Sequence, residues 1–112
     1  MEENAPKAEP KYVLIKIVAQ RRMGNRVMRV ALKNGAPGIT YYYARGTGVR
    51  EKLGFLANLI EAEKVIIEIV EEESRAAALL DTIVNETKIN EPGKGFCYIS
   101  PVTKVAGFYR GE

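Results

Sequence analysis

The chain contains no histidine and no tryptophan, and its only cysteine is Cys97. Without histidine, neither a Ser-His or Cys-His nucleophile nor a histidine metal site can form. A lone cysteine makes no internal disulfide and in the cytosol usually serves as a small apolar side chain. These absences exclude most hydrolytic enzymes. We therefore expect a protein that is not an enzyme and has no metal cofactor.

Long hydrophobic runs are also missing from the sequence. The longest apolar stretches, such as Tyr12–Ile15 and Val65–Ile67, are far shorter than the roughly 18–20 residues that cross a bilayer. No signal-peptide pattern opens the chain, so we expect a cytoplasmic protein. With 112 residues, 46% hydrophobic and 28% charged, the chain fits one folded domain.

Acidic residues are absent from Pro10 to Arg50. Between Pro10 and Arg50 there are nine basic residues and no acid, whereas residues 51–91 carry ten acids and four bases. The asymmetry fits self-complementary packing between elements or subunits. It also fits an anion site, for a phosphate or a nucleic acid, in the basic half. Charge alone leaves both interpretations open.

Hydrophobic patterning predicts four strands and two helices. Residues 1–11 are polar and rich in proline and should form a disordered N-terminal arm ahead of a domain at residues 12–112. Apolar, β-branched runs predict strands, and three- to four-residue apolar spacing predicts helices. The expected strands are Tyr12–Ala19, Ile39–Arg45, Lys64–Val70 and Phe96–Ser100, and the expected helices are Asn25–Asn34 and about 71–88. A long connector spans residues 49–62, and a short extended piece follows at residues 102–109.

The helix boundaries have local signals. Asn25 can cap the first helix, which should place Val27, Val30, Ala31 and Asn34 on one face before the stop at Asn34-Gly35. The acids at residues 71–73 suit a first helical turn, where they would complement the helix dipole as a solvated face. The second helix should then bury Ala77, Leu80, Ile83 and Val84.

The βαββαβ order predicts an α+β, ferredoxin-like sandwich, an antiparallel sheet with both helices on one face. The first and third strands are apolar on both sides, so copies of the chain should cover the face that the helices leave open. A homo-oligomer follows.

Several motifs have more than one interpretation. Glu68 lies inside an apolar strand and needs a partner or a ligand. The glycine-rich segments at residues 46–48 and 92–95 can be anion cradles or ordinary turns. Tyr41–Tyr43 could stack on RNA bases, but arginines near the first helix should lie on the opposite face from the strand aromatics. A basic nucleic-acid binder is therefore disfavoured.

Taken together, these segments resemble the nitrogen regulatory PII signalling proteins from Tyr12 to Glu112. The stretch Gly38-Ile39-Thr40 to Arg45-Gly46-Thr47-Gly48 is similar to the start and end of the family's second strand. Residues 64–70, Lys-Val-Ile-Ile-Glu-Ile-Val, resemble its third strand. Gly93 and Gly95 fit its B-loop, and Arg110-Gly111-Glu112 fits its end.

The resemblance implies a homotrimer with inward-facing sheets, non-enzymatic, with adenine-nucleotide clefts between subunits. A nucleotide or effector such as ATP, ADP, AMP or a small anion would set the shape of a T-loop that docks on a transporter or metabolic enzyme. The implied nucleotide-binding residues are Val18, Thr40, Gly46, Thr47, Gly48, Glu68, Val70, Gly93, Lys94, Gly95 and Arg110. Arg50 and Lys64 are implied anion or partner contacts of the T-loop.

Several residues differ from the family pattern, and these differences limit which ligands and modifications we expect. The T-loop, about residues 49–63, is short and has no tyrosine, so uridylylation is not expected. Arg50 replaces the glutamine that helps bind Mg²⁺ and 2-oxoglutarate. Phe96 replaces the B-loop lysine, and Gly107 and Tyr109 replace two phosphate-binding arginines. Nearby cations, namely Lys94, Lys104, Arg110 and Arg50, could substitute. The alternative is a ferredoxin-like metabolite-binding or interaction module that has lost nucleotide binding.

Overall fold

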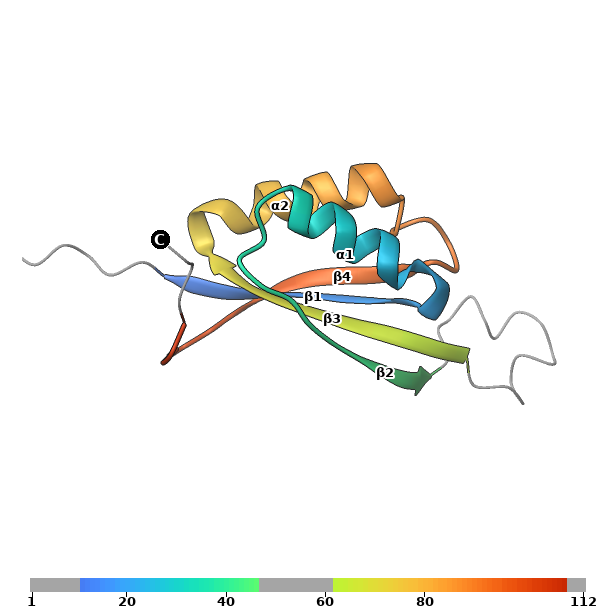
Figure 1. Ribbon diagram of the computed structural model, residues 1–112, viewed down its shortest axis with the longest axis horizontal. Helices are drawn as coiled ribbons and strands as arrows, with labels where there is room; N and C mark the ends of the chain where they lie inside the picture. The colour runs from blue at the N-terminus through green and yellow to red at the C-terminus, as the bar shows by residue number, and fades with distance from the viewer. Residues whose placement is uncertain (1–10, 47–61, 109–112) are drawn as a thin grey trace, which may run out of the picture.

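The computed structural model describes residues 11–46 and 62–108. The elements follow in the order β1 (Tyr12–Gln20), a 3-10 turn η2 (Arg21–Met23), α1 (Gly24–Lys33), β2 (Thr40–Gly46), β3 (Ala62–Glu72), α2 (Glu73–Thr87) and β4 (Gly95–Pro101). All strand pairs are antiparallel, in the order β2-β3-β1-β4. Both helices lie on one side of the sheet (Figure 1). The predicted ferredoxin-like βαββαβ sandwich is confirmed.

The hydrophobic core lies between the sheet and the two helices. Alternate residues of β1, from Val13 to Ala19, are buried there, and Ile15 and Ile17 have no exposed surface. Val65, Ile67 and Ile69 of β3 lie opposite them and are equally inaccessible. Burying one such side chain contributes about 1.5–3 kcal/mol, so this layer accounts for much of the stability.

The opposite side of the sheet, here called the helix-free face, carries the alternate residues of all four strands. The strand registers place on it Tyr12, Leu14, Lys16, Val18, Gln20, Thr40, Tyr42, Ile66, Glu68, Val70, Phe96, Tyr98 and Ser100. Its β1 residues are only half-buried. The prediction that β1 is covered on both faces therefore holds, within one chain, for the helix side only.

Helix α1 begins one residue earlier than predicted. Its N-cap is Met23, which makes no side-chain capping hydrogen bond, so the prediction that Asn25 caps the helix is wrong. The η2 turn instead leads the chain directly from β1 into the helix. The predicted stop is correct: the amide of Asn34 donates to Val30 and Ala31, and Gly35 adopts a φ of +94°. Val27 and Ala31 face the core as expected.

Helix α2 differs from the prediction in its start and in its buried face. Glu71 and Glu72 are the last residues of β3, and only Glu73 lies in the first helical turn. Glu71 is 2% exposed and accepts a hydrogen bond of 2.8 Å from the amide of Glu72. The assignment of residue 71 to a solvated face is therefore wrong. The buried positions are Ala76, Leu79, Ile83 and Thr87, one residue ahead of the predicted Ala77 and Leu80.

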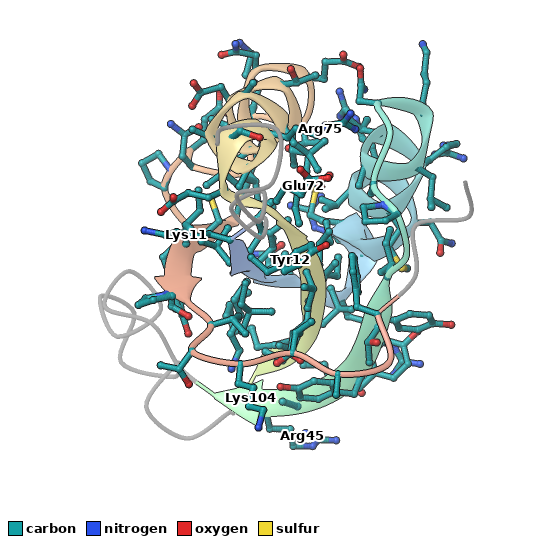
Figure 2. All side chains as sticks on the ribbon, turned by 90° about the vertical axis from the view of Figure 1, so that its left-hand side faces the viewer. Lys11, Tyr12, Arg45, Glu72, Arg75 and Lys104 are labelled. Carbon is teal, nitrogen blue, oxygen red and sulfur yellow. The ribbon has the colours of Figure 1, made fainter. Side chains whose placement is uncertain are left out.

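The remaining elements follow the predicted pattern closely. β4 is one residue longer at each end than expected. Residues 102–108 form no strand and cross the side of the sheet away from the helices (Figure 2). Of the predicted arm and connector, only Lys11 and Ala62 fall within the described residues. Neither α1 nor α2 has the length and apolarity of a membrane span.

Candidate functional site

The loop before β4 fits closely against the end of β1. Gly95 lies opposite Ala19, and a Cβ built on Gly95 would lie 2.3 Å from the carbonyl oxygen of Val18. Only glycine fits there without moving backbone, since carbon and oxygen never approach so closely. The backbone amide of Gln20 donates to the Lys94 carbonyl at 3.0 Å, and its side-chain amide donates to the Gly93 carbonyl. The glycine-rich segment 92–95, predicted as an anion cradle or an ordinary turn, is therefore a turn that hydrogen bonds from β1 hold in place.

Lys94, at the centre of this loop, is already paired within the chain. Its Nζ lies 2.8 Å from Oε1 of Glu91, three residues earlier. The hydrogen bond from Lys94, followed by its charge, holds the pKa of Glu91 below its usual range. An anion that binds Lys94 must therefore compete with the Glu91 carboxylate.

Glu68 has the partners that the sequence required of it. Its Oε2 lies 3.6 Å from Nζ of Lys16 on β1 and accepts a hydrogen bond of 3.1 Å from the Tyr42 hydroxyl on β2. Lys16 also lies opposite Tyr98 of β4. Tyr42, then Tyr98, and to a smaller extent Glu68 raise the pKa of Lys16. A row of polar side chains therefore crosses all four strands of the helix-free face.

Sequence reasoning missed the Lys16 half of this pair. Lys16 is the charged residue inside the otherwise apolar run Tyr12–Ala19, and Glu68 is the acidic residue inside the mainly apolar run Lys64–Val70. The two residues carry opposite charges. Because β1 and β3 are antiparallel neighbours, the two exceptions meet at one rung, Lys16 opposite Glu68. The fold class makes β1 and β3 antiparallel neighbours, but the register that pairs these two residues comes from the structure.

The predicted nucleotide-binding residues on the strands fall into separate groups. Thr40 lies opposite Glu68, with Val70 two residues along the same face. Val18 lies between Ile66 and Phe96, near the glycine loop. Gly46 ends β2 opposite Ala62, and Lys64 lies opposite both Gln20 and Ala44. Thr47, Gly48, Arg50 and Arg110 lie outside the described residues.

The two glycine segments lie on opposite edges of the sheet. Gly46 belongs to the edge strand β2, and Gly93 to Gly95 lead into the other edge strand, β4. Three interstrand spacings of about 4.8 Å separate the edges, so these segments are at least about 14 Å apart. One chain therefore does not bring the whole predicted set into a single pocket.

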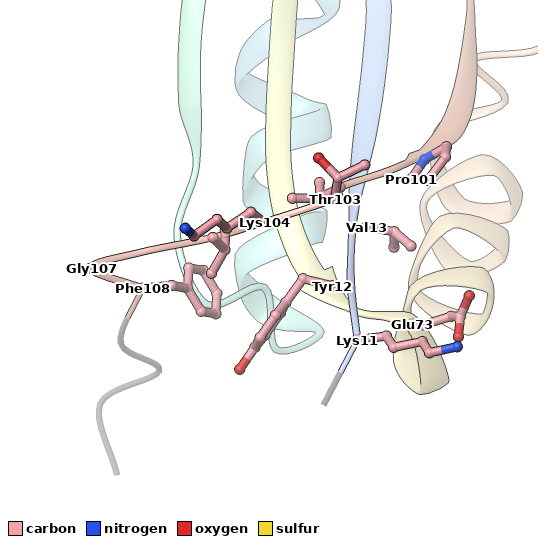
Figure 3. Close-up of a pocket in the computed structure, with 11 residues that line it drawn as sticks. Lys11, Tyr12, Val13, Glu73, Pro101, Thr103, Lys104, Gly107 and Phe108 are labelled. Atoms are coloured by element: carbon pink, nitrogen blue, oxygen red, sulfur yellow. The ribbon is translucent and has the colours of Figure 1, made fainter. Parts of the chain in front are cut away.

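A groove of about 830 Å³ lies where residues 101–108 cross the start of β1. Tyr12 and Phe108 pack edge to face across it, with ring centroids 5.0 Å apart. Figure 3 shows Lys104 on the crossing segment and Lys11 beside Glu73 at the start of α2. Both lysines are exposed. The groove therefore combines two cations and the Glu73 carboxylate with an apolar floor. Lys104 is one of the cations proposed from the sequence as a substitute phosphate ligand.

The aromatic side chains of β2 and β4 are exposed in the single chain and are not part of its core. Phe96 and Tyr98 of β4 stack on the helix-free face with centroids 6.2 Å apart and are 57% and 42% exposed. Tyr42 lies opposite in orientation to Tyr41 and Tyr43, as predicted. On the helix side, however, the guanidinium of Arg21 lies 4.1 Å from the centre of the Tyr43 ring. The expectation that arginines and strand aromatics occupy opposite faces is therefore wrong for this pair.

The Arg21 guanidinium is also bound to a carboxylate, since it donates to Glu63 at 2.8 Å.

Cys97, on β4, is half-buried, and burial raises the pKa of its thiol. Within residues 11–46 and 62–108, no group of acidic or cysteine side chains is arranged to hold a metal ion.

Comparison with known proteins relates the chain to one protein family. A model described as "Nitrogen regulatory protein P-II" matches residues 12–112. A solved structure of PII from Arabidopsis thaliana bound to citrate matches with a TM-score of 0.64 and 22% identity, covering 84% of this chain and 79% of that one. No curated protein matches the sequence.

Proposed function

Because the chain belongs to the nitrogen regulatory protein P-II family, we propose that it is a non-enzymatic signal-transduction protein. Three copies assemble with their helix-free faces turned inward. An adenine nucleotide, namely ATP, ADP or AMP, or a small anion binds at the clefts between copies. The ligand biases the conformations of residues 49–63, and these regulate a partner protein such as a transporter or a metabolic enzyme in the cytoplasm.

The single observation that supports this proposal is the division of the site residues between two sheet edges. Gly46 belongs to the β2 edge and the Gly93–Gly95 turn leads into the β4 edge, so three interstrand spacings, about 14 Å, separate them within one chain. A second copy that brings its β4 edge to the β2 edge of the first would join them. Such an assembly also covers the exposed rings of Phe96 and Tyr98, which burial in an interface would stabilise.

The cations of the site can bind a small carboxylate as well as a phosphate. Lys94 is the cation of the glycine turn and must exchange Glu91 for the ligand. Lys64, Arg50 and Arg110 are the further cations that we assign to ligand or partner contact. Citrate, bound by the Arabidopsis PII of similar fold, is a polycarboxylate. A small carboxylate therefore belongs in the ligand panel beside the nucleotides.

Two measurements on the full chain test the proposal. Sedimentation velocity should give a trimer, and isothermal titration of the same sample with ATP, ADP, AMP and citrate should give heat with at least one of them. Lys94→Gln should weaken that ligand about tenfold, as expected for a lost charge-assisted hydrogen bond. The exposed Lys33→Gln on α1 is the matched control and should leave the affinity unchanged.

The outcomes separate the parts of the proposal. A monomer in dilute buffer contradicts the shared clefts. A trimer that gives no heat with any of the four ligands contradicts the ligand assignment and favours the interaction module without nucleotide binding. An equal loss of affinity in Lys94→Gln and Lys33→Gln assigns the effect to overall charge and not to the glycine turn.

A further inference from the structure

Every charged side chain of η2 and α1 is a cation. Arg22 lies in the turn before the helix, and Arg26, Arg29 and Lys33 follow within it, all exposed. No acidic residue occurs in η2 or α1. We call these four residues the basic stripe.

The stripe points directly away from the core. At 3.6 residues per turn, Arg26, Arg29 and Lys33 fall within about 60° of arc, roughly opposite the buried Val27 and Ala31. With a rise of 1.5 Å per residue, the stripe from Arg22 to Lys33 is about 16 Å long. The helix therefore presents a straight row of cations at its outermost line.

Within residues 11–46 and 62–108, no carboxylate forms an ion pair with a residue of the basic stripe. Arg22 donates to the side-chain amide oxygen of Gln20 at 2.8 Å, and Arg26 donates to the backbone carbonyl of Glu86 at 2.7 Å. Within the described part of the chain, Arg29 and Lys33 make no hydrogen bond or ion pair. In contrast, Lys16, Arg21 and Lys94 are each paired with a glutamate. The positive charge of α1 is thus left for a partner.

We propose that the basic stripe docks on the anionic surface of a lipid bilayer. Figure 2 shows α1 (teal) and α2 (yellow) side by side over the sheet, so α1 does not protrude as a helix entering a nucleic-acid groove must. Because the cations form a straight row on the outside of the helix, all of them can contact a flat bilayer surface at the same time. Leu32, 57% exposed on the flank of the stripe, adds an apolar side chain that a headgroup region can accept and a phosphate backbone cannot.

The attraction is electrostatic and of moderate strength. Each Lys or Arg near an anionic membrane strengthens binding about fivefold, and salt screens the effect. Two stripe cations are thus worth roughly a 30-fold change in partitioning. The proposal needs neither a nucleotide nor residues 49–63, so it can fail or succeed independently of the proposed signalling function.

The test compares two double variants of equal net charge. Arg29→Gln with Lys33→Gln removes two stripe cations that hold no other group in the described structure. Arg75→Gln with Lys88→Gln, here called the α2 pair, removes two exposed cations, one within α2 and one at its C-cap. Each protein is mixed with vesicles of phosphatidylcholine alone or with phosphatidylcholine containing about one third phosphatidylglycerol, and the bound fraction is measured by flotation at low and high salt.

The expected result is binding to the anionic vesicles alone, reduced by high salt. Binding should fall about 30-fold in the α1 pair and less than about threefold in the α2 pair. No binding to anionic vesicles by the parent chain overturns the proposal, as does an equal loss in both pairs. Duplex DNA and single-stranded RNA are tested in parallel by fluorescence anisotropy. Affinity for either that depends on the α1 pair, without vesicle binding, assigns the stripe to nucleic acid instead.

Discussion

Replacing Gly95 with alanine tests whether the glycine turn is built by contact with β1. The added Cβ would lie 2.3 Å from the Val18 carbonyl oxygen and 2.9 Å from the Cα of Ala19, both backbone atoms. Relieving this overlap means moving β4 away from β1. Overpacking of this kind costs about 1–3 kcal/mol, and weakening the bond from Gln20 to the Lys94 carbonyl adds about 1 kcal/mol.

We therefore expect Gly95→Ala to lower the free energy of unfolding by about 2–4 kcal/mol. With an m value of about 2 kcal/mol/M, the urea midpoint should fall by about 1–2 M. Circular dichroism at one fixed protein concentration measures it, because assembly would make the midpoint depend on concentration. Gly93→Ala is the matched control: its φ is +83° but the Cβ meets nothing within 4 Å, so only about 1 kcal/mol of backbone strain is expected. A Gly95→Ala protein as stable as the parent, or one less affected than Gly93→Ala, would refute the close approach.

Three further predictions concern the loop and the core. Glu91→Gln should release Lys94 and strengthen binding of whichever anion gives heat by about two- to fivefold, as measured by isothermal titration. Since Lys94 lowers the pKa of Glu91, the ion pair should persist below the usual carboxyl range and break only as pH falls through that lowered pKa; NMR titration should show a higher pKa of Glu91 in Lys94→Gln than in the parent chain. Ile17→Ala, in the core, should cost about 2–5 kcal/mol in urea unfolding, whereas Leu32→Ala on the surface should cost under about 0.5 kcal/mol; similar losses would contradict the assigned burial.

The fold could be predicted because its signals are local and repeated. In a run such as Tyr12–Ala19, several apolar and β-branched residues together predict a strand. The βαββαβ order of the elements then restricts the possible topologies. The helix ends that were predicted well have a chemical marker, as at Asn34-Gly35. The start of α1 has none, since its N-cap Met23 makes no capping bond and the turn depends on the tertiary path out of β1.

The candidate site was only partly accessible to sequence reasoning. Residues 71–73 are identical in type, so nothing in the sequence separates the buried Glu71 from the exposed Glu73. That distinction arises where β3 ends and α2 begins. The pairs Lys16 with Glu68 and Lys94 with Glu91 depend on register and on loop shape. The pattern of residue types indicates which residues are exceptional, but their partners come from the three-dimensional arrangement.

The rung that joins Gly46 to Ala62 has a practical consequence. It fixes the two ends of the intervening insert at neighbouring points of the sheet, so the insert can change in length without shifting the register of β2 against β3. Doubling such an insert costs only about 0.6 kcal/mol in closure entropy. The scaffold is therefore suited to accepting foreign peptides at this position, and a tag or epitope grafted there should be displayed on an otherwise unchanged framework.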